Sequence, residues 1–153
     1  MTESNFAGNI IVNLANLPDF LRKPILKKRM MEFFSLSSTE KEEIINNALE
    51  AGPEIPFPNF SKLFKTWLEI LVILSDEQRK ELFFSYIDEV SKNPQKLINF
   101  NLDGILEIYL SLHNEQKITI AKTIKEIIEN LENEKRRRLM IIIPDNAKNH
   151  LGL

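Results

Sequence analysis

Histidine and carboxylate side chains are the groups in this sequence that could support catalysis or bind a metal. The chain has two histidines, His113 and His150, and no cysteine, so cysteine nucleophiles, thiolate metal sites and disulfides are excluded. His113 occupies a helix corner where serine stands at other corners, which favours a capping role, and His150 lies close to the last residue. No nucleophile, base and orienting group can be assembled around either histidine. The sequence therefore predicts a non-enzymatic protein with no catalytic residue, cofactor or metal.

Three glutamates recur at nearly equal intervals within apolar segments. Glu32, Glu69 and Glu107 are separated by 37 and 38 residues, a spacing typical of two-helix repeats. Stacked units would place one carboxylate per unit about 10 Å apart, too far for one cation bound at about 2 to 2.6 Å. We interpret the three glutamates either as a stripe that contacts a partner or as ordinary solvated positions.

Two basic clusters could contact phosphate groups. The first lies within 22–29 and includes Lys27, Lys28 and Arg29, and the second lies at 135–138 and includes Arg136, Arg137 and Arg138. If both clusters lay on one side of the protein, they could bind nucleic acid with an affinity that falls as salt rises. The aromatic residues do not alternate with these basic residues as they do in single-strand binders. Solvated helix faces, paired with nearby acids, are the simpler interpretation.

A proline-rich segment interrupts the helical pattern at 52–59, Gly-Pro-Glu-Ile-Pro-Phe-Pro-Asn. Three prolines in eight residues predict an irregular loop. Ile55 and Phe57 in this loop have two interpretations. They either fold back on the core or form a protruding apolar anchor, which would lose little entropy on binding a partner.

The elements that position these residues are organised around a helix corner. The segment Leu-Ser-Asp-Glu-Gln-Arg at 74–79 ends one apolar helix and starts the next with a Ser75 or Asp76 cap and acidic residues in the first turn. Related corners stand at 17–22, 36–41, 112–117 and 143–148. Each of them marks the junction of two helices.

The spacing of apolar residues predicts helices between these corners, with a kink or break at Pro24. Their expected ranges are 24–36, 38–51, 60–74, 75–92, 102–112, 114–131 and 134–143. The helix at 60–74 is the most apolar and should lie near the centre. The predicted fold is a single all-α domain over 1–153, in which 1–15 is either a flexible arm or a short leading helix. Antiparallel helical hairpins would form a short right-handed solenoid, as in armadillo and HEAT repeats, or an irregular helical bundle, with units at about 24–52, 60–93, 101–132 and 134–153.

The succession of a helix ending in Leu or Ile, a Pro/Ser and Asp/Ser corner, an acidic residue and then Lys or Arg resembles two known superhelices. These are the cytosolic N-terminal domain of MgtE magnesium transporters and the flagellar motor-switch protein FliG. The resemblance extends over 17–151 in rhythm only, and the proline-rich 52–59 loop departs from it. It implies a right-handed superhelix of short helices that contacts another protein or domain, and it assigns no functional residue.

Composition limits the remaining functional classes. The chain of 153 residues is 43% hydrophobic and 27% charged, with a net charge of −2, which is ordinary for a globular domain. Its apolar runs are shorter than the roughly 18 to 20 residues of a membrane helix, and its start does not resemble a secretory signal, so a cytoplasmic location is expected. The sequence predicts a protein-interaction or scaffold module that binds an unidentified protein or peptide. The alternative is a nucleic-acid-associated protein, and the oligomeric state stays open.

Overall fold

The computed structural model describes residues 6–153, and side chains from residue 8 onward. Within this range the chain is helical and contains no strand, which confirms the all-α prediction. The elements are α1 (Phe6–Ala15), α2 (Asp19–Phe33), α3 (Ser38–Ala51), the short 3₁₀ helix η2 (Gly52–Glu54), α4 (Phe57–Ile73), α5 (Asp76–Lys92), α6 (Gln95–Ile98), α7 (Leu102–Leu110), α8 (Asn114–Glu129), α9 (Asn133–Ile142) and α10 (Asp145–Leu151).

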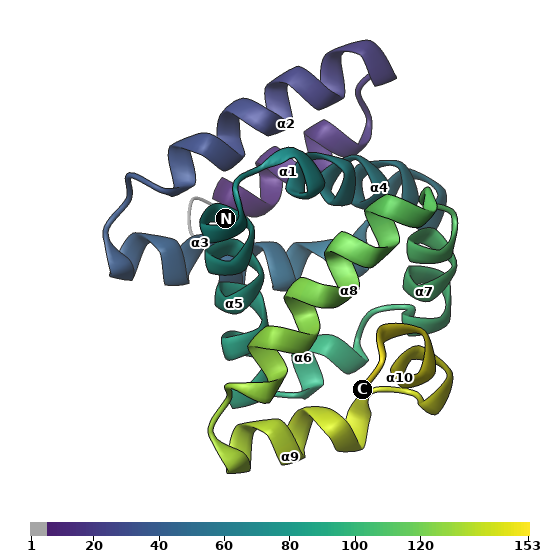
Figure 1. Cartoon of the computed structure of the whole chain (residues 1–153). Helices are drawn as coiled ribbons and strands as arrows, with labels where there is room; N and C mark the ends of the chain where they lie inside the picture. Colours follow the sequence, from purple (N-terminus) through teal and green to yellow (C-terminus); the bar gives the residue numbers. More distant parts are fainter. Residues whose placement is uncertain (1–5) are drawn as a thin grey trace.

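Helices two or three positions apart in the chain make most of the contacts between helices. Helix α1 packs on α3, α2 on α4, α3 on α5, α4 on α7, and α5 on α8, while α2 and α9 lie at opposite ends of the molecule (Figure 1). This pairing differs in detail from hairpins of consecutive helices, which would have placed 75–92 against 60–74. Leu74 and Ser75 are both extended, with ψ angles of 164° and 159°. They carry α5 away from α4, so α5 packs against α3 and α8 instead.

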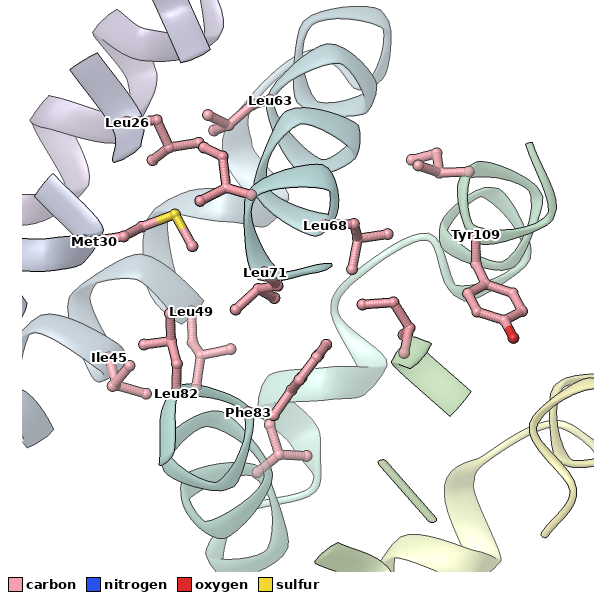
Figure 2. Close-up of a cluster of buried hydrophobic side chains, with 14 of the residues drawn as sticks. Leu26, Met30, Ile45, Leu49, Leu63, Leu68, Leu71, Leu82, Phe83 and Tyr109 are labelled. Carbon is pink, nitrogen blue, oxygen red and sulfur yellow. The ribbon is translucent and has the colours of Figure 1, made fainter. Parts of the chain in front are cut away.

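The apolar core is built around α4. Side chains from α2, α3, α4 and α5 converge in it, among them Met30, Leu49, Leu71 and Leu82 (Figure 2). Ile70 and Leu71 of α4 are 0% exposed. The prediction that the most apolar helix lies near the centre is therefore confirmed.

Side-chain caps define the corners at several helix starts. The hydroxyl of Ser37 accepts a hydrogen bond from the backbone N–H of Glu40, and that of Ser75 accepts one from Gln78, at 3.2 and 3.1 Å. Ser37 and Glu40 complete a reciprocal capping box. His113 lies at the N-cap of α8, where its backbone N–H donates to Gln116 at 2.9 Å. His113 therefore occupies the N-cap position, but its side chain makes no capping hydrogen bond.

Several predicted boundaries are wrong, and proline accounts for two of them. Helix α2 continues through Pro24, whose missing N–H would have paired with Phe20, a residue on the exposed side where water can satisfy its carbonyl. Helix α4 starts at Phe57 and not at residue 60, because Pro58 stands in its first turn, where backbone N–H groups have no helical partner. The irregular segment is therefore shorter than 52–59.

The two ends of the described chain are also helical. Residues 6–15 form α1, whose Leu14 and Ala15 are buried, so the leading-helix interpretation holds for them, and residues 1–5 lie outside the described range. Helix α10 continues the chain after Pro144, which acts as its N-cap. None of the helices in residues 6–153 is long and apolar enough to cross a lipid bilayer.

Candidate functional site

Three arginines stabilise helix corners. Each donates hydrogen bonds to backbone carbonyl groups at the end of the helix that precedes its corner. Arg79 is 6% exposed, and its guanidinium donates to the carbonyls of Leu71, Val72 and Leu74 at 2.7 to 3.0 Å. It also donates to Asp76 Oδ1 at 2.8 Å. The carbonyls of Val72 and Leu74 gain a partner that the end of α4 does not supply, while the carbonyl of Leu71 also accepts from the backbone N–H of Leu74 at 3.2 Å. We call this arrangement an arginine corner.

The same arrangement recurs twice, and the three arginines stand at intervals of 57 positions in the sequence. Arg22 is buried and binds the carbonyls of Leu14 and Leu17 and the carboxylate of Asp19. Arg136 is half-buried and binds the carbonyls of Glu129 and Leu131 and the side chain of Asn133 at 3.3 to 3.4 Å, while its Nε has no partner in the described residues. The pattern common to all three is Leu-x-Asp/Asn-x-x-Arg.

Arg136 is therefore directed at its own corner and not at a phosphate-binding surface. The other predicted basic residues of α9 are also engaged: Arg137 and Arg138 pair with Glu134, and Lys135 pairs with Asp88 of α5. Lys27, Lys28 and Arg29 are exposed on α2, at the opposite end of the molecule from α9 (Figure 1). The structure does not bring the two basic clusters together on one face.

The arginine corners predict a specific pH dependence of stability. Hydrogen bonding and the charge of Arg79 hold the pKa of Asp76 below its ordinary value of 3.8. The unfolded chain then takes up the proton at higher pH than the folded chain does. Stabilisation by this carboxylate is present above pH 3.8 and is lost as the pH falls through the folded pKa. We expect Asp76→Asn to flatten the dependence of unfolding free energy on pH in this acidic range, as measured by urea denaturation.

Glu77→Gln is the matched control, because Glu77 stands beside Asp76 in the first turn of α5 and has no ion pair in the described residues. Equal flattening in the Asp76→Asn and Glu77→Gln variants would contradict the role of the arginine.

The proline-rich segment folds onto the core. Ile55 is buried, and Phe57 is half-buried, with its ring centroid 6.0 Å from that of Phe60. A Cβ atom at Gly104 would stand 2.9 Å from Cε1 of Phe57 and closer still to Cζ. Glycine at this position of α7 therefore lets the Phe57 ring approach. Ile55 and Phe57 do not form the protruding anchor that was one of the two interpretations.

The three predicted glutamates lie on neighbouring helices. Glu32 is on α2, Glu69 on α4 and Glu107 on α7, and α4 packs against both of the other helices. Glu32 and Glu107 are exposed, Glu69 is half-buried, and Glu32 pairs with Arg29 at 3.3 Å. His150 is exposed on α10. Within residues 6–153, no three His, Asp or Glu side chains form a group that could hold a metal ion.

Helix α2 has an exposed surface that combines apolar and basic side chains. Its inner side is formed by Arg22, Leu26, Met30 and Phe33, which are buried against the rest of the molecule. The outer face of α2, as we define it, carries the exposed residues Phe20, Leu21, Lys23, Ile25, Lys27, Lys28 and Met31. Lys23, Lys27 and Lys28 have no ion pair with any described residue. Ile25 is part of this face although the adjacent Leu26 is buried.

A central cavity of about 540 Å³ is lined almost wholly by apolar side chains. Its lining includes Arg29 and Glu32 of α2, which are its only charged residues in the described part of the chain. Protein interiors are close-packed, with few voids larger than a water molecule. The cavity is partly open to solvent, so its apolar lining is left in contact with water. A bound apolar group would remove that lining from water, which is favourable.

Sequence reasoning missed both the buried arginines and the cavity. The corners at 17–22 and 74–79 were recognised as helix junctions, but a charged residue in a first turn is normally exposed. The corner at 131–136 was not recognised. The repeated Leu-x-Asp/Asn-x-x-Arg pattern is the signal that could have identified all three arginines.

Comparison of this chain with protein-family models, with curated proteins and with solved structures finds no match. The candidate sites are therefore defined by the residues described above.

Proposed function

We infer that the protein is a non-enzymatic interaction module and that it binds a partner protein through the outer face of α2. The exposure of apolar side chains on this one helix carries the proposal. Four of the ten large apolar side chains that are exposed in residues 8–153 belong to α2, and Phe20 is 76% exposed. Single exposed apolar residues are normal on a protein surface, but a group of them on one helix is typical of an interaction site.

The charges on this face indicate the chemistry of the partner. Three lysines of this face, Lys23, Lys27 and Lys28, lie among the apolar residues. None of them forms an ion pair with a described acidic residue. A partner that matches the face would be an amphipathic helix or extended peptide with acidic and apolar side chains. Apolar contacts would then supply most of the affinity, and complementary charge would favour encounter and orientation.

Nucleic acid remains the rival partner for the basic residues of α2. Several observations favour a protein instead. Phe20 and Met31 stand beside the lysines and would not contact phosphate, and the second basic cluster lies at the far end of the molecule with its cations engaged.

The test is a quantitative pull-down with three forms of the protein from native lysate, with and without nuclease treatment. They are the wild type, a Phe20→Asp/Met31→Asp double variant, and Ile141→Asp. We expect a defined protein that survives nuclease treatment and moderate salt with the wild type. Its recovery should fall at least about tenfold with the double variant, because losing a central apolar contact costs about 2 kcal/mol or more.

Ile141 is the matched control because it is 76% exposed, like Phe20, and lies on α9 at the other end of the molecule. Ile141→Asp should bind as the wild type does. Recovery that disappears with nuclease would replace the proposal with nucleic-acid binding. Equal recovery with Phe20→Asp/Met31→Asp and with Ile141→Asp would remove the outer face of α2 as the binding surface.

A further inference from the structure

The central cavity has the size and lining of a ligand site. Its volume of about 540 Å³ falls within the range of about 300 to 1,000 Å³ that is typical of small-molecule pockets. Side chains from every helix between α1 and α9 line it, and it is partly open to solvent. A cavity bordered by this many elements cannot be closed by moving one side chain.

Aromatic rings form one side of this cavity. On α4, the rings of Phe60 and Phe64 stack with centroids 5.5 Å apart, and Phe64 stacks with Trp67 at 5.6 Å. Two rings of α5 meet Trp67 edge-on, Phe83 at 5.5 Å and Tyr86 at 5.3 Å. These contacts fix the orientation of the rings. The aromatic side of the cavity is therefore preformed.

Two hydrogen-bond donors in the lining lack an acceptor. Within the described residues, neither the Tyr86 hydroxyl nor the Trp67 indole N–H has a hydrogen-bond partner, and both residues line the cavity. Burial raises the pKa of Tyr86 to about 12. Both side chains are only half-buried by surface area, and neither donor atom is fully buried. Both donors are therefore accessible, and an acceptor oxygen of a ligand in the cavity could bind them.

The lining favours a neutral acceptor over an anionic one. Arg29 is the only cationic residue of the lining, and it already pairs with Glu32 at 3.3 Å at the edge of the cavity. A carboxylate placed beside Tyr86 would lose its hydration without gaining a cation.

We propose that the central cavity binds a neutral, hydrocarbon-rich ligand that carries one carbonyl or ester oxygen. The hydrocarbon chain lies along Phe60, Phe64 and Leu139, and the oxygen accepts hydrogen bonds from Tyr86 and Trp67. This site is separate from the outer face of α2, and its test does not depend on the proposed protein partner.

The sequence contains a built-in reporter, because Trp67 is the only tryptophan. The probe is the methyl ester of a long-chain brominated fatty acid, since bromine quenches tryptophan fluorescence on contact. We expect saturable quenching of Trp67 with one probe per protein, reversed by the same ester without bromine. The corresponding free acid should bind at least about tenfold more weakly, because its charge is not matched in the cavity.

Two variants locate the probe. Ala48 is a small buried residue of the lining, and Ala48→Phe should fill the cavity and abolish quenching. Tyr86→Phe should weaken binding by about two- to tenfold, the loss expected for one hydrogen bond. Tyr109→Phe is the matched control, because Tyr109 is the other tyrosine and its hydroxyl donates to the carbonyl of Lys117 at 3.0 Å, outside this cavity.

The wild-type titration alone can overturn the proposal. Absence of quenching, or quenching that does not saturate, would show that the probe does not enter the cavity. Binding of the free acid as tight as that of the ester would overturn the neutral-ligand class. If Tyr86→Phe and Tyr109→Phe bind the ester equally well, the hydroxyl of Tyr86 is not an anchor. Circular dichroism of Ala48→Phe separates a filled cavity from a failure to fold.

Discussion

Arg79→Met is expected to lower the free energy of unfolding by about 2 to 6 kcal/mol, because the carbonyls of Val72 and Leu74 each lose their hydrogen-bond partner at a cost of about 1 to 3 kcal/mol. The guanidinium binds three carbonyls at the end of α4 and the carboxylate of Asp76. Methionine has a similar volume but no donor, so the carbonyls of Val72 and Leu74 would lose their partner, while that of Leu71 keeps the N–H of Leu74. Urea denaturation followed by far-UV circular dichroism measures the loss.

Arg136→Met is the matched control within the same chain. Its contacts are longer, at 3.3 to 3.4 Å, its side chain is half-buried, and its Nε has no partner in the described residues. The loss should be about 1 kcal/mol, as for an ordinary hydrogen bond. Equal losses at Arg79 and Arg136 would mean that the buried carbonyl contacts are not the source of stability.

Leu71→Ala is expected to lower the free energy of unfolding by about 3 to 5 kcal/mol, the upper part of the range for buried leucine. Leu71 is 0% exposed in the centre of α4, where it meets side chains of α2, α3 and α5 (Figure 2). Neighbours on all sides prevent the site from collapsing around the smaller side chain. The same urea denaturation reports the change.

Ile73→Ala provides the comparison on the same helix, because Ile73 lies two residues further along and is 58% exposed. It should cost less than about 1 kcal/mol, as surface substitutions usually do. If Leu71→Ala cost no more than Ile73→Ala, α4 would not be the centre of the core.

The helical corners could be predicted because their signals are local. Ser37 and Ser75 stand immediately before a helix and cap it, and the apolar spacing of 60–74 indicated a central helix. The wrong boundaries have equally local causes. Pro24 and Pro58 were read as helix breakers, but the first lies on an exposed side of α2 and the second lies in the first turn of α4.

The candidate sites were harder to predict because they depend on contacts between distant segments. Phe60, Phe64 and Trp67 have the spacing of core residues, and sequence alone does not show that a cavity borders them. Phe83 and Phe84 are adjacent aromatic residues, yet only Phe83 is buried and Phe84 is exposed. The outer face of α2 was seen only as a basic cluster, because the exposure of Phe20 and Met31 depends on which side of α2 packs against α4.

The packing of helices against others two or three positions away has a consequence for the route by which the chain folds. Such contacts join segments that are close in sequence, so little loop-closure entropy is lost before each contact forms. Chains rich in local contacts fold faster than chains that must first join distant segments. A growing chain could therefore dock a new helix onto one two or three positions before it, and an arginine corner would set the direction of the next helix as soon as that corner is complete.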